Sequence, residues 1–545
     1  MYQILILLLF YFIILYSILG YGKILTLINS NYQASSFDGL LGITFLILIS
    51  YFTNFFFPHN YLHNSLILII GLVIFIYDFN KNFSKRILDY RDISIIFLII
   101  FIGILMFKNH DDFYYYHFPY TVILTEFDKI FGLGNLNHGF RTPSSIFYLN
   151  SLFYLPVIEY FMINSGAIYI LGFSNFILFN LIKDLLKKKE FNHILFLSLL
   201  ALIYINSTFA RIAEHGTDRS ALILIFLMSI YYLKSVDFKK FSINLSYLNN
   251  YYSKLAILFS LIVSLKAFYL IYSVIFIAWF LQIKKFLNLK QLFFLIFKSF
   301  YSYIVLFIFI FTIFTMFSNT GCLIYPASFT CFENLSWSVP VDQVNQMKLW
   351  YEQWSKAGAN PNFRVEDPAT YVSQFNWVSN WINIYFFNKV SDSILVIIFI
   401  TITIFFIFSY NSKIKNKSRV NFKLFYFLIF LLFLEWFYNH PSLRYGGYTL
   451  LALMFFIPIS VYLSKFKIKP FIIEKKIYLI FLLVVLVFVS RNIIRIDKEY
   501  RQYDYNPFKN AFFYLNNDGF ILRDTVKKQY KDFENTKKYF LIIKN

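Results

Sequence analysis

The sequence predicts an all-α polytopic membrane protein. Of its 545 residues, 59% are hydrophobic and only 14% are charged, whereas an average soluble protein carries about 25% charged residues. Apolar runs long enough to cross a hydrocarbon core about 30 Å thick recur along the chain. Glycine, proline and cysteine number only 17, 12 and 2, which excludes collagen-like, low-complexity and disulfide-scaffold proteins.

Twelve apolar stretches are candidate membrane spans. They lie near residues 2–20, 39–57, 62–79, 93–107, 166–182, 192–206, 220–233, 299–316, 391–409, 424–438, 447–464 and 476–490. A further stretch, 255–282, would measure about 42 Å as one helix, which is too long for a span without strong tilt. We expect it to break at Ser264-Leu265-Lys266 into a hairpin of two short helices. The total is then about 14 transmembrane helices.

Basic residues predict the orientation of these spans. The chain carries 50 Lys and Arg against 29 Asp and Glu, a net charge of +21, and the lysines cluster in loops between apolar runs. Because cytoplasmic loops collect Lys and Arg, this charge indicates topology and not a nucleic-acid partner. The expected outer loops are 108–165, 207–219, 317–390 and 439–446.

We expect three regions along the chain. Residues 1–80 form an N-terminal three-helix transmembrane bundle, 81–490 form the transmembrane core, and 491–545 form a polar extracytoplasmic tail. The first span has no basic segment before it, which argues against a cleaved signal peptide.

The first outer loop opens with two adjacent carboxylates, Asp111 and Asp112. One could act as general base on an acceptor hydroxyl, while the other orients it or holds a divalent cation such as Mg or Mn. The alternative is a solvated helix cap stabilised by the helix dipole. Two interfacial helices are expected next, at Pro119–Phe131 and about 146–163, and His138 and Arg141 lie between them.

The second outer loop is dense in ionisable residues. It packs Arg211, Glu214, His215, Asp218 and Arg219 into nine positions between two spans. Ionisable groups at a membrane face are costly and are usually functional or paired. This loop therefore forms either a binding site or an ion-pair network that only closes the end of the bundle.

Lys266 is a cation within an apolar run. If the predicted break lies near the outer face, its ammonium group could bind a lipid-linked phosphate. The alternative is a lysine whose charged end reaches the interface.

The last two outer loops add a cysteine pair and a guanidinium. Cys322 and Cys331 are the only cysteines and are expected to form a disulfide. The tryptophans of 317–390 are either interfacial belt residues or sugar-stacking platforms. Arg444 beside His440 suits phosphate or pyrophosphate recognition, unless Glu435 neutralises the guanidinium in a purely structural pair.

These motifs resemble known membrane enzymes. An acidic pair after an apolar helix, followed by two interfacial helices, resembles the C-type glycosyltransferase superfamily, whose members use polyprenyl-phosphate-linked sugars. The sequence is also similar to an uncharacterised bacterial family of large multi-pass membrane proteins associated with surface polysaccharides. That similarity rests on the runs around Asp111-Asp112, Asn137-His138-Gly139, Cys322-Leu-Ile-Tyr325-Pro326, Trp337-Ser-Val-Pro340 and His440-Pro-Ser-Leu-Arg444. Three spans precede the one that leads into the acidic loop here, whereas in the superfamily that loop follows the first span, so 1–80 is taken as an added bundle.

The resemblance implies a glycosyltransferase of the bacterial inner membrane with its active face extracytoplasmic. It would move sugar from a polyprenyl-phosphate-linked donor to a glycan or lipid acceptor, with Asp111 or Asp112 as the catalytic carboxylate. In such reactions, most of the rate enhancement comes from stabilising the negative charge that develops on the leaving phosphate. The residues expected to bind substrate are His138, Arg141, His215, Asp218, Arg219, Lys266, His440 and Arg444.

Two other functions stay open. A polysaccharide polymerase or ligase would also act on lipid-linked glycans, but through outer Arg and His residues. A lipid-glycan transporter or flippase would place its ionisable site near the middle of the membrane, where Lys266 and Glu435 are the candidates.

Overall fold

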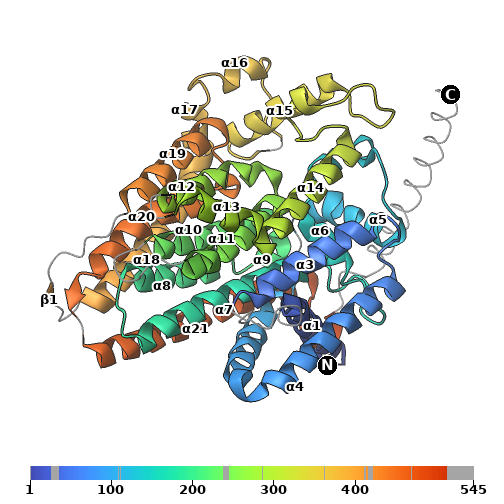
Figure 1. Cartoon of the computed structure of the whole chain (residues 1–545). Coiled ribbons are helices and arrows are strands. Elements are labelled where there is room, and N and C mark those ends of the chain that lie inside the picture. The colour runs from blue at the N-terminus through green and yellow to red at the C-terminus, as the bar shows by residue number, and fades with distance from the viewer. Residues whose placement is uncertain are drawn as a thin grey trace.

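The computed structural model describes residues 2–25, 36–107, 110, 112–236, 245–284, 287–360, 362–409, 413–414, 422–467 and 469–511. These residues are predominantly helical, as Figure 1 shows, and two short strands, β1 (Lys413–Ile414) and β2 (Phe466–Lys467), pair antiparallel. The all-α fold class predicted from the sequence is confirmed for this part of the chain.

Six helices in the described residues are long and apolar enough to cross a membrane. They are α1 (Tyr2–Gly22), the first arm of α4 (Tyr61–Ser84), α7 (Ser165–Lys187), α14 (Phe300–Thr320), the helix Val378–Ser409 that includes α18 (Ser391–Ser409), and α21 (Pro470–Tyr503). Shorter apolar helices are α3 (Asp38–Thr53), α8 (His193–Thr208), Ala267–Ile283 and α20 (Gly447–Leu463). The chain is therefore a multi-pass membrane protein by the length and composition of its helices.

The remaining helices complete the bundle or connect its ends. Those that matter for the site are α5 (Phe118–Glu126), α6 (Ser145–Ser151), α9 (Ile212–His215), α10 (Thr217–Ser235), α11 (Leu245–Leu265), α12 (Ser273–Ile283), α15 (Val341–Lys356) and α19 (Lys423–Asn439). Asparagine begins several helices, because its side chain accepts the free backbone N–H groups of the first turn. Asn60 does so for α4 and Asn192 for α8.

Helix α4 (Tyr61–Ile100) bends back on itself (Figure 1). The hydroxyl of Tyr90 donates to Asp78 Oδ2 at 2.8 Å. In a straight helix these residues would lie about 18 Å apart, so the two arms of α4 must lie side by side. Lys23, which directly follows α1, forms an ion pair with the Asp78 carboxylate at 2.7 Å. The predicted span 62–79 lies in the first arm, whereas only residues 93–100 of the predicted span 93–107 belong to the second arm, because the helix ends at Ile100.

The predicted hairpin at 255–282 is confirmed. Helix α11 ends at Leu265, and Lys266 has an extended backbone. The ammonium of Lys266 lies 2.6 Å from Asp218 at the start of α10, whereas Trp279 Nε1 donates to Ser235 Oγ at the other end of α10. The chain therefore runs along α10 to Lys266 and returns. We call the end of the bundle that carries Lys266 the site end.

The two helices expected at the membrane interface are internal instead. Nearly every residue of α5 and α6 is buried, so neither helix has the exposed polar face of an interfacial helix. The second is also shorter than expected, because Pro156 lacks a backbone N–H donor and Val157 and Glu159 adopt positive φ angles. The helices pack against each other, and α6 also packs on α3.

Two expected boundaries do not coincide with breaks in the fold. Residue 80 lies inside α4, and helices α1, α3 and α4 pack together while α4 also contacts α7. Residues 491–503 continue helix α21 and are not a separate appendage. The short helix α22 (Pro507–Asn510) follows and contacts α1. Residues 512–545 of the expected tail lie outside the described residues.

Glycine allows α1 and α3 to approach closely. A Cβ atom on Gly42 would overlap the carbonyl oxygen of Ile18 and would lie 3.0 Å from the backbone nitrogen of Gly22. Small residues at such contacts are typical of packed membrane helices, because close backbone approach replaces the hydrophobic driving force.

Replacing Gly42 with valine is expected to lower the thermal midpoint of the purified protein in detergent. The added side chain meets backbone and not a movable side chain, so the overpacking cost should reach about 1–3 kcal/mol or more. The matched control is Phe52→Leu on the exposed face of the same helix, where we expect little change. Equal midpoints for Gly42→Val and the wild type would show that α1 and α3 can separate without cost.

Candidate functional site

A buried carboxylate joins two cations at the site end of the bundle. Asp218 Oδ1 lies 2.6 Å from Lys266 Nζ, and Asp218 Oδ2 lies 2.9 Å from Arg444 Nε. The Asp218 side chain is only 5% exposed, whereas Lys266 and Arg444 keep 22% and 29% of their side-chain surface. The carboxylate thus lies beneath two cations that remain accessible from outside the protein.

Local backbone geometry brings Arg444 to this position. The 3₁₀ helix Leu443–Tyr445 ends at Gly446, whose φ is +127°. A side chain there would be strained, and its Cβ would lie 2.6 Å from the Tyr272 hydroxyl. Tyr269 fixes the same turn, since its hydroxyl donates to the Arg444 carbonyl oxygen at 2.7 Å.

Asp112 extends the ionic cluster. Its Oδ2 lies 3.5 Å from Arg444 Nη2 and 3.3 Å from His110 Nδ1. Burial raises the pKa of the Asp112 carboxyl, but the hydrogen bond from His110 and the positive charge of Arg444 outweigh it and hold the pKa well below its usual range. Asp112 is therefore ionised at physiological pH. Its predicted partner, Asp111, lies outside the described residues.

Aromatic rings surround the two cations. Lys266 Nζ lies 4.8 Å from the ring centroid of Tyr445, and Arg444 Cζ lies 5.4 Å from that of Trp354. These distances allow cation–π attraction. The ring of His440 contacts Phe268 and Tyr445 edge-on, and burial lowers the pKa of His440 to about 4. His440 thus borders the site as a neutral imidazole.

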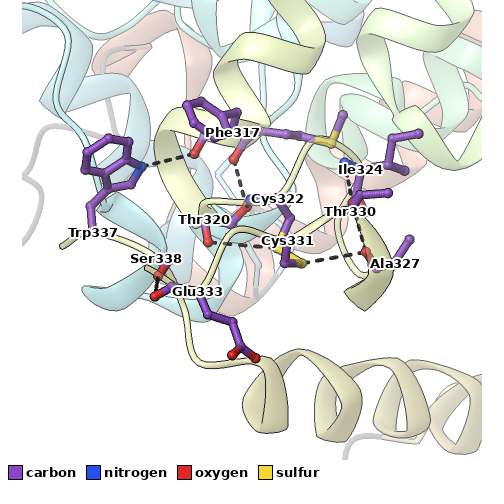
Figure 2. Close-up of a disulfide and its surroundings, with 11 residues drawn as sticks. Phe317, Thr320, Cys322, Ile324, Ala327, Thr330, Cys331, Glu333, Trp337 and Ser338 are labelled. Atoms are coloured by element: carbon purple, nitrogen blue, oxygen red, sulfur yellow. Dashed lines mark hydrogen bonds between the residues drawn. A yellow bond between two sulfur atoms is a disulfide. The ribbon is translucent and has the colours of Figure 1, made fainter. Parts of the chain in front are cut away.

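The long loop before α15 is tied to the end of α14. Cys322 and Cys331 form a disulfide, and Trp337 Nε1 donates to the carbonyl oxygen of Phe317, as Figure 2 shows. Helix α15, which carries Trp354, follows this loop and lies with α16 (Pro368–Val372) and α17 (Val378–Trp381) at the top of Figure 1. The disulfide-containing loop therefore helps to hold Trp354 against Arg444.

Two tryptophans act neither as belt residues nor as exposed stacking platforms. Trp377 and Trp381 are buried and pack against Phe437. Trp381 Nε1 also donates to the carbonyl oxygen of Pro441 at 2.9 Å. They anchor the 439–446 loop, and with it Arg444.

Several predicted residues lie away from the ion pairs. Arg141 is buried and donates to the Gly134 carbonyl and to Gln343 Oε1, so it connects the first loop to α15. His138 Nδ1 lies 2.7 Å from the Tyr115 hydroxyl. Arg219 forms no ion pair with a residue that the structure describes.

Two further expectations concern neighbours of these residues. The side chain of His215 lies outside the described residues. Glu435 does not neutralise Arg444: it accepts a hydrogen bond from Asn439 Nδ2, while Arg444 binds Asp218 and Asp112. Glu435 and Asn439 are one turn apart on α19, so the Glu435 carboxylate has its hydrogen-bond partner on its own helix.

Three side chains on α21 that were not predicted from the sequence support the site. Arg495 Nη2 donates to the carbonyls of Ile102 and Leu105. Glu499 Oε2 accepts from the backbone N–H of Phe107, and Asn492 Nδ2 donates to the carbonyl of Ala210. These side chains hold the two segments that lead to Asp112 and Asp218. The spacing 492, 495, 499 places them on one helical face, and that periodicity was the available signal.

The arrangement is suited to binding an anion. Asp112 and Asp218 balance Lys266 and Arg444, so the cluster is neutral until an anion arrives at the exposed side of the two cations. Arg and Lys are the usual partners of phosphate oxygens. Within the described residues, no group of three or more His, Cys, Asp or Glu side chains is arranged to hold a metal ion.

Replacing Asp218 with asparagine is expected to destabilise the protein strongly. Removing one partner of a buried ion pair costs about 3–5 kcal/mol, because it leaves buried charge uncompensated. The matched control is Asp497→Asn, whose exposed pair with Arg501 should contribute about 0–1 kcal/mol. Thermal unfolding of both variants in detergent measures the difference, and equal losses would show that the Asp218 pairs carry no special stability.

Acidification should destabilise the folded protein between about pH 6.5 and pH 4. The pKa of His440 is lowered to about 4 by burial, so the unfolded chain binds a proton in this interval while the folded chain does not. Stability is therefore complete above the ordinary histidine pKa and falls as the pH drops. Comparing thermal midpoints at pH 7 and pH 5 tests this, since His440→Phe should show a smaller drop than the wild type. An unchanged drop would assign the effect to other groups.

No curated protein and no solved structure matches the sequence. A family model matches residues 1–451, a range that includes the N-terminal helices and every residue of the ionic cluster, whereas all of α21 lies beyond it. The chain belongs to the family described as Domain of unknown function (DUF8201).

Proposed function

We propose that the protein is a glycosyltransferase of the bacterial inner membrane. It moves a sugar from a polyprenyl-phosphate-linked donor to a glycan or lipid acceptor on the extracytoplasmic face, in surface-polysaccharide synthesis. The observation that carries this proposal is the convergence of Asp112, Lys266 and Arg444 from distant parts of the chain, each with an exposed side, over the buried Asp218.

The donor phosphate binds Lys266 and Arg444. Both cations face outward and are oriented from below by Asp218, so a phosphate can approach without displacing the buried carboxylate. A guanidinium and an ammonium fixed in advance stabilise charge that develops on the leaving phosphate. Asp218 is a positioning residue in this scheme, because it acts through the two cations.

Asp112 is the catalytic base. It accepts the proton of the acceptor hydroxyl as that oxygen attacks the anomeric carbon, and the electron pair of the broken bond leaves with the polyprenyl phosphate. While Arg444 is paired with Asp112, the carboxylate is a weak base because its pKa is low. A donor phosphate that takes over the guanidinium would raise this pKa. Base strength would then increase only when donor is bound.

The proposed architecture is about 14 transmembrane helices with a C-type glycosyltransferase-like core. The reversal of α4 and the hairpin at Lys266 support the higher count, since each adds a crossing to the long helices. Lys266 lies at the end of its hairpin beside the start of α10. That position favours a transferase over a flippase, whose ionisable site would lie near the midplane.

The test is transfer of radiolabelled sugar from polyprenyl-phosphate donors by membranes containing each variant. Asp112→Asn should lower the rate by about 10²–10⁴-fold, because the amide cannot accept the proton. Arg444→Lys should lower it by about 10²-fold, because the second donor to the leaving phosphate is lost. In the same assay, the variant Asp111→Asn tests whether the adjacent carboxylate contributes to the rate of sugar transfer.

The matched control is Asp497→Asn, an exposed carboxylate-to-amide change far along α21. It should transfer sugar at the wild-type rate. If the wild type transfers no label from neutral, amino or acidic sugar donors, the transferase proposal is wrong, and lipid-linked glycan flux across vesicles becomes the next measurement.

A further inference from the structure

An apolar cavity of about 220 Å³ lies between the second arm of α4 and helices α7, α8 and α21. Its lining on α4 extends from Asp92 to Ile100, which is about 12 Å along the helix. Most of the lining side chains are isoleucine, leucine, valine or phenylalanine. Since an apolar cavity of about 150 Å³ already accepts benzene, this one is large enough for a segment of a hydrocarbon chain.

The two amide side chains in the lining bind each other. Asn175 Nδ2 donates to Asn206 Oδ1 at 2.9 Å, and Asn206 Nδ2 donates back to Asn175 Oδ1 at 2.8 Å. Asn206 Nδ2 also donates to the carbonyl of Leu202. Because these amides already have partners, the middle of the cavity does not require a polar ligand. Its walls therefore suit an apolar one.

The side of the cavity is open to the surroundings of the bundle. Val484 and Phe488 are buried, whereas Ile95 is 48% exposed. The rings of Phe179 and Phe481 are partly exposed, and their centroids lie 5.3 Å apart. Exposed apolar side chains of membrane helices face lipid, whose chains are as apolar as leucine. A lipid chain can thus enter between α4 and α21 from the side.

One end of the cavity is charged. Asp92 is the one charged lining residue among those that the structure describes. Its Oδ2 lies 2.7 Å from Lys183 Nζ, and its Oδ1 lies 2.8 Å from Arg91 Nη2. The Asp92 side chain is 8% exposed, whereas Lys183 and Arg91 keep 28% and 59% of their side-chain surface. Two cations against one carboxylate leave a net positive charge on the accessible side, where a phosphate group can bind.

This charged end lies opposite the site end. Lys183 is in the last turns of α7, and α8 begins shortly after α7 ends. The two helices pack together, and α8 ends at Thr208, shortly before Asp218. The exposed residues Lys187, Lys188 and Lys189 follow Lys183, and basic segments of this kind mark the cytoplasmic side. Anionic lipids of that leaflet are attracted to Lys and Arg near the membrane surface.

We propose that this cavity holds one hydrocarbon chain of an anionic phospholipid from the surrounding membrane, with the lipid phosphate on Arg91 and Lys183. The inference goes beyond the proposed transfer reaction and does not depend on it. A chain in the cavity restores dispersion contacts that its walls lack when they are empty. It would stabilise α21, the helix whose Asn492, Arg495 and Glu499 hold the segments that lead to the ionic cluster.

Lipid binding to the delipidated full-length protein in detergent tests this without an activity assay. The probes are phosphatidylglycerol, phosphatidylcholine with the same acyl chains, and polyprenyl phosphate. A bound ligand raises the thermal midpoint, so titration of each lipid gives its affinity. The wild type should bind phosphatidylglycerol about fivefold or more tightly than phosphatidylcholine, the gain expected when one cation attracts an anionic headgroup.

A variant that fills the cavity tests the position of the chain. In Val485→Trp the larger ring occupies the space of the chain, so affinity for both phospholipids should fall about tenfold or more. Val487→Trp makes the same change at an exposed position of α21 and should bind as the wild type does. Ile95→Trp blocks the opening instead and replaces Val485→Trp if that variant does not fold. The thermal midpoint without added lipid shows which variants are folded.

A second variant tests the headgroup. Arg91→Gln should lower the affinity for phosphatidylglycerol to that for phosphatidylcholine and leave phosphatidylcholine binding unchanged. The matched control is Arg501→Gln, which removes an exposed guanidinium paired with Asp497 and should leave both affinities unchanged. Arg444→Lys should also bind both phospholipids as the wild type does, so this result is separate from any loss of sugar transfer.

Three results would overturn the inference. These are equal affinity of the wild type for the two phospholipids, unchanged phospholipid affinity in the folded cavity variants, and retention of the phosphatidylglycerol preference by Arg91→Gln. If the cavity variants weaken polyprenyl phosphate binding alone, the cavity holds the chain of that lipid and the phospholipid proposal is wrong.

Discussion

The pairing of one buried carboxylate with two cations is the interaction on which the site end of the protein depends. Asp218 lies in the first turn of α10, Lys266 lies at the turn of the hairpin that follows, and Arg444 is 226 residues from Asp218. Charges removed from water are tolerated only when they are paired with good geometry, so these contacts determine how the segments meet. The same pairing leaves the outer sides of both cations available to an incoming anion.

A second constraint comes from the irregular backbone beside this cluster. Carbonyl groups at the ends of helices need hydrogen-bond partners where water is scarce. Helix α21 supplies them: Arg495 binds the carbonyls after α4, and Asn492 binds the carbonyl that precedes Arg211. Both segments that lead to the acidic residues are thus attached to one helix, which lies entirely beyond the region matched by the family model. The spacing between Asp112 and Asp218 depends on a part of the chain that looked like a polar tail.

Aromatic rings hold the two cations from the sides. Lys266 Nζ lies 4.8 Å from the ring centroid of Tyr445, and Arg444 Cζ lies 5.4 Å from that of Trp354. Together with the buried Asp218 carboxylate, these contacts fix both positive charges in place, so little reorganisation is needed when an anion binds.

The sequence alone determined the all-α fold class, the membrane-spanning composition, the break at Lys266 and the segments that contribute polar residues. Apolar length and local charge encode these properties, and both can be seen without knowing which segments touch. Only the tertiary structure decided that Arg444 pairs with Asp218 and not Glu435, that Arg141 connects loops instead of joining the cations, and that α5 and α6 are internal. Those outcomes depend on contacts between residues far apart in the chain. A local pattern cannot specify them, because the free energy of a buried charge is set by the partners that packing places beside it.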